Sequence, residues 1–434
     1  MKIKTKRLSY AEVMALPRPA HRKPIHPSLL LASLIRLLSI PELMQTKFRY
    51  TEERMDAVGK SPCLILMNHS SFIDLKIAFR IFYPRPLSIV CTSDGFVGKP
   101  NLMHFLGCIP TQKFVTDISL LKDMRHALFC RKSNILLFPE ASYSFNGCAT
   151  PLPQKFGLLL KQLKVPVVTI RTEGAFSHDP LYNNLQKRKV PVSAHVQCLL
   201  TPEEIAERSV DELDAMLKEV FTFDHFAWQR EKGIEINEKF RADGLNRILY
   251  QCASCGTEGE MEGSGIHLTC RHCGKVHELT PLGRLKAEDG EETFTHIPDW
   301  YAWQREQIAA AVAEDRYILD TEVEIGMMVN YRAIYMVGEG RLIHNREGFT
   351  LTGCDGQLEY HHGPLAAHSV YSDYFWYELG DVICIGNKDC LYYCFPKQKD
   401  VVARTRIAAE EIYAYHRAKH RRKKTPAEEP APTT

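Results

Sequence analysis

The stretch Ser61–Leu75, which reads SPCLILMNHSSFIDL, decides the fold of the first half of the chain. Its four consecutive apolar residues, Leu64–Met67, lie between a Ser-Pro pair and a polar run, which is typical of a fully buried strand. A serine in the polar run can cap a helix that begins near Phe72. The pattern therefore predicts a strand, a polar turn and a helix, with His69 where the strand ends and Asp74 in the first helical turn.

This strand–turn–helix context would bring the carboxylate of Asp74 to the imidazole of His69. On a single helix the two side chains would not align, because five residues correspond to about 500° of rotation. A carboxylate bonded to one ring nitrogen fixes the tautomer and leaves the other nitrogen free to take a proton from a hydroxyl. In a chain with 18 histidines this spacing occurs about once by chance, so its meaning depends on the segments that accompany it.

Three further segments accompany the pair. Gly107–Pro110 reads GCIP, Leu136–Ser142 reads LLFPEAS and Val165–Ile170 reads VPVVTI, and the last two contain short apolar runs typical of strands. Together with Asn68–Asp74, these segments resemble the four motif blocks of the PlsC-type glycerolipid acyltransferases. The resemblance covers roughly residues 48–220, which is less than half of the chain.

The resemblance implies an α/β fold, a glycerolipid acyltransferase-like sheet with flanking helices, and an enzyme in which His69 and Asp74 are catalytic. It implies an O-acyltransferase that moves a fatty acyl group to a hydroxyl of a glycerolipid or glycolipid acceptor in a membrane. The donor would be a thioester or an acyl phosphate, so acyl-ACP (an acyl carrier protein), acyl-CoA and acyl phosphate all stay open. The expected substrate-binding residues are Asn68, Phe138, Pro139, Glu140 and Ser142 from the resembling blocks, with Lys113 and the spare candidate Arg171 as cations for a phosphate.

The chain departs from the family pattern in more than one motif; Thr169 stands where the fourth block has its second proline, and the third block is altered as well. Where the family has Glu-Gly-Thr-Arg, this chain has Glu140, Ala141, Ser142 and Tyr143. In the family that arginine is understood to bind the acceptor phosphate, and a tyrosine cannot supply a bidentate cationic fork. Lys113 could still meet a phosphate as a point charge. The sequence therefore indicates intact chemistry with an altered acceptor pocket, which disfavours lysophosphatidic acid and favours a neutral or sugar-like head group.

Other classes of function compete with this interpretation. A non-catalytic lipid-binding or scaffold protein could use the same fold, because the acceptor motif is altered and further modules follow it. A nucleic-acid partner is not expected, since the net charge is only +3. No Gly-x-Ser-x-Gly motif occurs in the sequence, which disfavours a serine hydrolase.

Length and composition limit the number of domains and indicate where in the cell the protein is expected. The chain has 434 residues, enough for two or three domains, and no run of 18 apolar residues, so we expect no transmembrane helix. Residues 1–47 are rich in Lys and Arg, and Ser28–Ile40 predicts a short apolar helix that carries Arg36. Such a helix suits the headgroup region of an anionic membrane or the apolar back of the next domain. Fourteen cysteines without a secretory signal favour a cytoplasmic protein, peripheral at the inner face of the membrane.

Two Cys-x-x-Cys-Gly knuckles form the second strong signal in the sequence. Their four thiolates would give Zn²⁺ a closed tetrahedral shell without room for a water, so the metal would be structural. The glycine after each pair permits the turn whose amides bond the sulfurs. The spacing resembles a zinc ribbon, although iron in a rubredoxin-like site would use the same ligands. The expected ligands are Cys252, Cys255, Cys270 and Cys273.

The last third of the chain has short alternating apolar runs separated by glycine turns, followed by a long helix. This order weakly resembles the pleckstrin-homology-like (PH-like) architecture, whose members bind lipid head groups or peptides or serve as scaffolds. The expected division of the chain is a basic, amphipathic N-terminal segment over 1–47, an acyltransferase domain over 48–222, a linker helix over 223–247, a zinc ribbon over 248–285, a second linker helix over 286–316, a PH-like β domain with its C-terminal helix over 317–420 and a disordered tail over 421–434.

Overall fold

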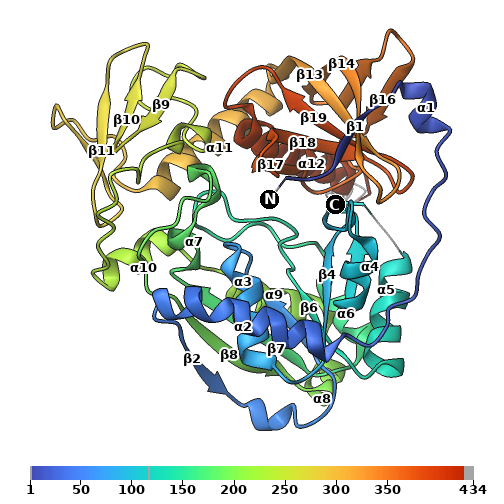
Figure 1. Cartoon of the computed structure of the whole chain (residues 1–434). Coiled ribbons are helices and arrows are strands. Elements are labelled where there is room, and N and C mark those ends of the chain that lie inside the picture. Colours follow the sequence, from blue (N-terminus) through green and yellow to red (C-terminus); the bar gives the residue numbers. More distant parts are fainter. Residues whose placement is uncertain (1, 116–117, 425–434) are drawn as a thin grey trace, which may run out of the picture.

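The computed structural model describes residues 2–115 and 118–424. Figure 1 shows three β-sheets in different parts of the molecule. A mixed sheet flanked by helices lies in the lower half of this view, and a small and a large antiparallel sheet lie above it. The chain is therefore mixed α/β with additional antiparallel sheets.

The mixed sheet is built around the buried strand β3 (Leu64–Met67). Its order is β2-β8-β7-β3-β6-β4-β5, and only β7 and β8 pair in antiparallel fashion. A strand with parallel neighbours on both sides is covered on both faces, which explains why β3 is apolar without alternation. The other strands are β2 (Arg49–Glu53), β4 (Leu87–Thr92), β5 (Cys108–Thr111), β6 (Asn134–Leu137), β7 (Val167–Glu173) and β8 (Ser193–Leu200).

Helices cover both faces of the mixed sheet. Ile65 and Met67 of β3 belong to one apolar cluster with α3, whereas Leu64 and Leu66 belong to another with α6 and α9. The helices of this part are α2 (Leu29–Gln45), α3 (Ile73–Phe82), α4 (Pro100–Phe105), α5 (Ile118–Arg125), α6 (Phe156–Leu163), α7 (Ala175–His178), α8 (Pro202–Glu207), α9 (Val210–Val220) and α10 (His225–Glu231). Shorter helical turns occur at Met55–Ala57, Ser93–Phe96, His126–Cys130, Leu181–Asn183 and Leu245–Arg247.

The small antiparallel sheet has the order β12-β11-β10-β9. Helix α11 (Ile297–Ala313) follows it, and the fully buried Trp300 of this helix donates Nε1 to Gln251 O at 2.9 Å. This bond fixes α11 directly beside the first cysteine knuckle. The strands are β9 (Met261–Ser264), β10 (His267–Cys270), β11 (Val276–Leu279) and β12 (Leu285–Ala287).

The large sheet contains strands from both ends of the chain. Its seven C-terminal strands are antiparallel in the order β16-β15-β14-β13-β19-β18-β17, and the N-terminal strand β1 (Thr5–Arg7) pairs with β14 in parallel. Residues 1–47 are therefore divided, because β1 and α1 (Tyr10–Met14) lie on this C-terminal domain while α2 covers the mixed sheet (Figure 1). The strands are β13 (Ile318–Met328), β14 (Ile334–Asn345), β15 (Gly348–Gly353), β16 (Leu358–His362), β17 (Tyr371–Trp376), β18 (Gly380–Gly386) and β19 (Leu391–Pro396).

Helix α12 (Val401–Lys424) ends the described chain and packs against α11 and β17. The predicted tail over 421–434 is wrong in its first four residues, which continue α12, and residues 425–434 lie outside the described residues. One apolar cluster joins the small antiparallel sheet and the C-terminal domain to Phe145 of the mixed-sheet part. The parts thus share a core, while the PH-like architecture of the last one stays a prediction.

Candidate active site

The turn after β3 brings His69 and Asp74 together. His69 Nδ1 lies 3.2 Å from Asp74 Oδ2, and the same carboxylate oxygen accepts the backbone amides of Ser70 at 2.8 Å and Ser71 at 3.0 Å. The two amides belong to the turn itself and lock the carboxylate at the start of α3. Asp74 is buried, and its Oδ1 has no hydrogen-bond partner within the described residues.

Two aromatic rings enclose the imidazole of His69. Phe138, at the end of β6, stacks on it with ring centres 4.0 Å apart, and Tyr143 stacks on it at 3.8 Å. The side chain of His69 is 15% exposed. The imidazole therefore has one orientation, in which Nδ1 faces the carboxylate. Sequence reasoning treated Tyr143 only as a lost arginine and missed its ring contact, because stacking across a loop leaves no pattern in the sequence.

Burial sets the protonation states of the pair. It holds the pKa of His69 well below its ordinary value, and the nearby charge of Lys113 lowers it further. Burial also raises the pKa of Asp74 to about 7, although the amides of Ser70 and Ser71 act in the opposite direction. At neutral pH the imidazole is therefore neutral.

Glu140 lies buried in the loop that follows β6. Burial raises the pKa of Glu140 well above its ordinary value, and the charge of Arg406 opposes this shift without cancelling it. Both carboxyl oxygens are buried and make no hydrogen bond of ordinary geometry within the described residues, although the side chain of Thr150 and the backbone of His69 lie close enough to oppose the rise of the Glu140 pKa. When protonated, a carboxyl in this position beside His69 and Asp74 can both donate to and accept from a hydroxyl group.

Asn68 and Pro139, two other residues expected to bind substrate, are buried in the framework of the site. Asn68 Oδ1 accepts the backbone amide of Thr172 at 2.7 Å, and its Nδ2 donates to Ser70 Oγ at 3.0 Å. Asn68 thereby fixes the end of β3 to β7. Pro139 is buried in the turn that carries the neighbouring loop.

The two cations expected near the acceptor lie in different places. Lys113 Nζ lies 4.2 Å from the centre of the Tyr371 ring on β17, and burial lowers its pKa. Its charge acts on His69, so it belongs to the surroundings of the site. Arg171 is 42% exposed and lies 3.9 Å from Glu173, outside the cluster around His69.

Sequence reasoning also missed the side chains that support the turn from behind. Ser71 Oγ donates to Asp179, and Ser70 Oγ lies 3.1 Å from His225 Nε2. Burial raises the pKa of Asp179 to about 7 and lowers the pKa of His225 to about 4. Asp179 and His225 lie 108 and 155 residues beyond their partners, so no local motif could have marked them.

The four predicted metal ligands come together at the edge of the small sheet. Their Sγ atoms all lie within 4.8 Å of one another, with 3.7 Å between Cys252 and Cys273 and 3.8 Å between Cys255 and Cys270. A tetrahedral ion with metal–sulfur bonds of about 2.3 Å requires sulfur–sulfur edges of about 3.8 Å. The thiols therefore fit a tetrahedral metal ion.

The two knuckles have matching backbones. Gly256 N donates to Cys252 O and Gly274 N donates to Cys270 O, both at 2.9 Å. Both glycines have φ of 76°, a conformation that other residues rarely adopt. The repeated Cys-x-x-Cys-Gly pattern is thus explained by a turn that only glycine closes without strain.

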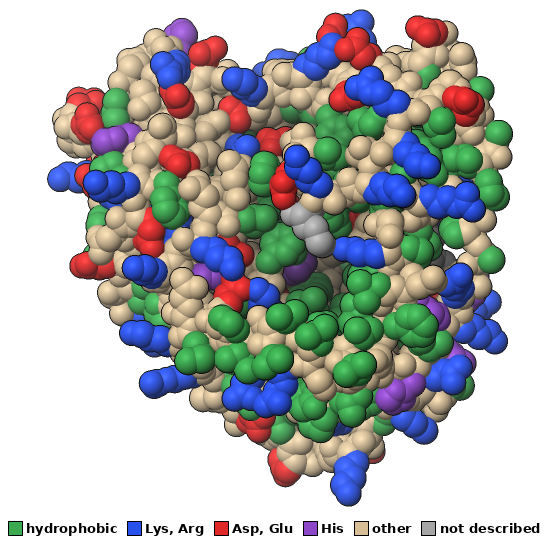
Figure 2. Space-filling model, viewed as in Figure 1, with side chains coloured by type: hydrophobic (Ala, Val, Ile, Leu, Met, Phe, Trp, Pro, Cys, Tyr) green, Lys and Arg blue, Asp and Glu red, His purple; other side chains and the backbone are tan. Residues whose placement is uncertain are grey.

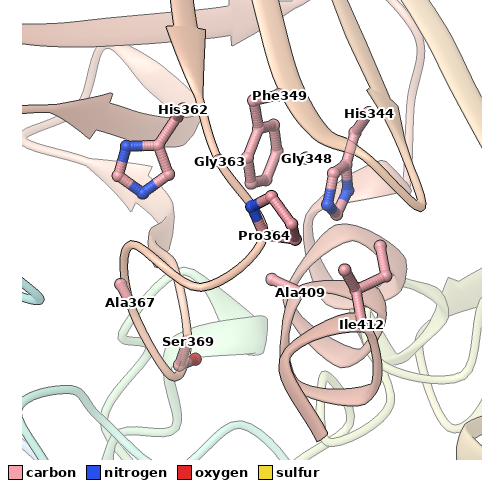
Figure 3. A pocket seen from close by; sticks show the side chains of 10 residues that line it. All are labelled: His344, Gly348, Phe349, His362, Gly363, Pro364, Ala367, Ser369, Ala409 and Ile412. Carbon is pink, nitrogen blue, oxygen red and sulfur yellow. The ribbon is translucent and has the colours of Figure 1, made fainter. Parts of the chain in front are cut away.

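The C-terminal domain contains a small cavity (Figure 3). Its volume is about 20 Å³, room for little more than one water. His344 and Phe349 stack at its wall with ring centres 3.7 Å apart, and burial lowers the pKa of His344 to about 3. This cavity is too small for a lipid head group.

Comparison with known proteins identifies the part of the chain that holds the His69 cluster. Residues 46–173 match the family described as Acyltransferase. The human 1-acyl-sn-glycerol-3-phosphate acyltransferase beta (Homo sapiens) is 26% identical over 141 residues, which are 32% of this chain and 50% of that protein. The chain thus spans about half the length of this curated relative.

Among solved structures, the 1-acyl-sn-glycerophosphate acyltransferase PlsC from Thermotoga maritima is 15% identical, with a TM-score of 0.35. The similarity covers 44% of this chain and 76% of that one. His69, Asp74, Glu140 and Ser142 all lie within the matched residues 46–173, whereas the cysteine cluster and the C-terminal domain lie outside them.

Proposed function

We propose that this chain is an O-acyltransferase of membrane lipid synthesis, which moves a fatty acyl group from a thioester or acyl-phosphate donor to a hydroxyl of a glycerolipid or glycolipid. The proposal rests mainly on the protonation and orientation of the His69 imidazole. Its Nδ1 faces Asp74 and its pKa is low because it is buried, which leaves Nε2 as the ring nitrogen that does not face the carboxylate. A neutral imidazole with one free nitrogen is a general base. The acyltransferase match over residues 46–173 supports the same chemistry.

In the proposed reaction, His69 Nε2 accepts the proton of the acceptor hydroxyl while the hydroxyl oxygen attacks the acyl carbonyl carbon. An ester C–O bond forms, and the bond from that carbon to the donor's sulfur or phosphate oxygen then breaks. The proton passes from His69 to the departing thiolate or phosphate. Asp74 stabilises the imidazolium between these steps through its bond to Nδ1. No covalent acyl-enzyme is needed.

The surroundings of Glu140 support a hydroxyl-bearing acceptor. A buried polar atom without a hydrogen bond of ordinary geometry costs free energy, and both carboxyl oxygens of Glu140 are in this state, even though the charge of Arg406, the Thr150 side chain and the His69 backbone favour the ionised form. A glycerol or sugar hydroxyl would satisfy both the donor and the acceptor of the neutral carboxyl. Tyr143, in place of a cation, fits a head group that is recognised by its hydroxyls rather than by a phosphate.

The first prediction concerns the base. His69→Ala should lower acyl transfer at least about 100-fold, because it removes the group that takes the hydroxyl proton in the proposed reaction. The assay incubates the protein with labelled acyl donors and a panel of lyso-lipids and glycolipids, and reads the products by mass. His195→Ala, which changes a half-exposed histidine of β8, should keep normal turnover. Near-normal transfer by His69→Ala would end the proposal and favour a lipid-binding scaffold.

The second prediction concerns pH. Because Asp74 has a pKa of about 7, it takes up a proton as the pH falls through this value and no longer stabilises the imidazolium. We expect kcat/KM to be constant above about pH 8 and to fall about tenfold per pH unit below about pH 6.5. Asp74→Asn cannot ionise and should show a lower plateau without this acid limb. A wild-type profile that stays flat from about pH 5.5 to 8.5 would contradict the assignment.

We also propose that the protein works as a peripheral protein on an anionic membrane surface. No helix in the part of the chain that the structure describes is long and apolar enough to cross a bilayer. Figure 2 shows apolar side chains gathered in a band across the lower half of this face, with Lys and Arg around them. The exposed apolar residues of α2 are Leu29, Leu30, Leu34, Leu37, Leu38, Ile40 and Met44.

This apolar surface continues to the active site. The end of α4 meets the start of α2, where Ser28 N donates to Phe105 O at 2.9 Å, and Phe105 is itself exposed. Phe72, also exposed, stacks on Tyr143 with ring centres 5.4 Å apart, and Tyr143 stacks on His69. Helix α2 packs against α3, which begins directly after Phe72, so an acyl chain that leaves the bilayer along α2 would meet apolar side chains next to the imidazole.

A groove of about 480 Å³ lies beside the exposed face of α2. Glu42 of the same helix is paired with Lys76, Lys187 and His178, so its carboxylate does not neutralise the cations that line the groove. Positive charge beside apolar surface suits anionic lipid head groups. The groove is lined by Arg36, Lys47, Arg49 and Arg80 and by the apolar residues Ile40, Leu43, Met44 and Phe48.

The third prediction tests this surface. Leu30→Ser combined with Leu37→Ser should weaken binding to vesicles with about one third anionic lipid by roughly tenfold or more, because each leucine side chain loses its transfer free energy into the interface. Vesicle co-sedimentation measures the effect. Ile318→Ser, which changes an exposed apolar residue of the C-terminal domain, is the matched control and should bind normally. Equal vesicle binding by the wild type, the double leucine variant and Ile318→Ser would contradict the proposal that the exposed face of α2 lies on the membrane.

Zinc is the metal that we propose for the cysteine cluster. Four thiolates and a tetrahedral spacing suit a structural Zn²⁺, which would stabilise the small sheet and take no part in acyl transfer.

The fourth prediction is that the purified protein holds one zinc per chain in elemental analysis. Cys255→Ser should lose most of it and unfold at a lower temperature, whereas Cys130→Ser, a change at an exposed thiol elsewhere, should retain it. Iron in place of zinc would contradict the metal assignment.

A further inference from the structure

A side chain from the far end of the sequence holds the loop beside His69. Arg406 of α12 donates Nη2 to Ser142 Oγ at 2.6 Å and Nη1 to Tyr143 O at 3.2 Å. Its guanidinium carbon also lies 4.4 Å from the centre of the Phe145 ring. A planar fork of donors can reach a side chain and a backbone carbonyl at the same time, whereas a lysine ammonium acts as a point charge.

The charge of Arg406 is buried and supported from behind. Its side chain is 4% exposed, and Glu410, one turn further along α12, lies 3.5 Å from its Nε. Glu410 in turn accepts from Arg305 of α11 at 2.6 Å and from Ser369 at 2.8 Å. A buried guanidinium is costly unless its donors are paired, and these contacts pair it on several sides. Two helices of the C-terminal half thus present this cation to the loop.

The loop that Arg406 holds makes direct contacts to His69. The Tyr143 ring stacks on the imidazole at 3.8 Å, and Ser144 N donates to His69 O at 3.0 Å. Ala141, earlier in the loop, has φ of 56°, a left-handed conformation that costs about 1 kcal/mol for a residue with a Cβ. A loop with this strain needs contacts from outside to keep one conformation.

We propose that Arg406 is a positioning residue for acyl transfer: α12 holds the loop at Ser142 and Tyr143 so that Tyr143 keeps the His69 imidazole in its reactive orientation. The catalytic part of this inference rests on the proposed function, but the ordering of the loop does not. The acyltransferase domain is then incomplete without the C-terminal domain. Its loop carries Tyr143 where the resembling family has an arginine, and a guanidinium 263 residues later contacts the carbonyl of this residue.

The test compares two conservative variants of the same helix. Arg406→Lys keeps a charge beside Glu410 but cannot bridge Ser142 and Tyr143. Arg404→Lys is the matched control, since Arg404 donates to Ile318 O at 3.1 Å, pairs with Glu258 and is not bonded to the loop. The measurements are kcat, the KM for the donor, the thermal midpoint, and backbone hydrogen exchange over residues 139–148.

For Arg406→Lys we expect kcat to fall about 10- to 100-fold, the size of effect that a small misplacement of a catalytic group produces. The KM for the donor should stay within about twofold, and exchange over residues 139–148 should become at least about tenfold faster. Ethylguanidinium added to Arg406→Ala should restore part of kcat, because it can occupy the vacated site. Arg404→Lys should match the wild type in kcat and in loop exchange.

Two results would overturn the proposal. The first is an Arg406→Lys protein with normal kcat and normal loop exchange. The second is a fall in kcat that is proportional to the fall in the thermal midpoint in both Arg406→Lys and Arg404→Lys. Arg406 would then act on activity only through the stability of the fold. Should Arg406→Lys not fold, Ser142→Ala removes one of the two bonds without changing α12, and normal kcat and loop exchange in this variant would also overturn the proposal.

Failure of the proposed function gives a different result. In that case the wild-type chain transfers no acyl group to any acceptor in the panel, and neither arginine variant changes this. The hydrogen-exchange comparison still decides whether Arg406 orders the loop, because it does not depend on turnover.

Discussion

The confinement of one imidazole is the constraint on which the rest of the structure depends. His69 is held by the Asp74 carboxylate at Nδ1 and by the rings of Phe138 and Tyr143 on its two faces. These partners come from the start of α3, the end of β6 and the following loop, so the mixed sheet must place all of them within a few ångströms. Burial by the same groups keeps the imidazole neutral, and Nε2 is the ring nitrogen that does not face Asp74.

The C-terminal half of the chain is joined to this site rather than attached at a distance. Tyr371 and Trp376 of β17 both donate to the buried Asp94, which follows β4 of the mixed sheet. Lys113 lies against the Tyr371 ring while its charge reaches His69, and Arg406 contacts the loop that carries Tyr143. Helix α11 packs against α12, and Glu258, which lies between the two cysteine knuckles in the sequence, pairs with Arg404 of α12. The two antiparallel sheets thus shape the surroundings of His69.

The sequence predicted the features that short segments determine, and it missed the contacts between residues far apart in the chain. The apolar run Leu64–Met67 predicted the central strand, which the structure has with the same bounds, and the two Cys-x-x-Cys-Gly patterns predicted a four-cysteine cluster, which is confirmed. The acyltransferase resemblance is confirmed by the match over residues 46–173. No periodicity could reveal that β1 pairs with β14 or that Arg406 reaches Tyr143, because such contacts depend on how separate domains pack.

The most direct test of the central claim is nitrogen-15 NMR of the His69 ring in the full-length protein across a pH titration. We expect a neutral ring protonated at Nδ1, bonded to Asp74, that stays neutral down to a pH well below 6.5. Its signals should shift near pH 7 only because Asp74 takes up a proton there. A ring that averages between tautomers, or that gains its own proton near pH 6.5 as a free histidine does, would contradict the account.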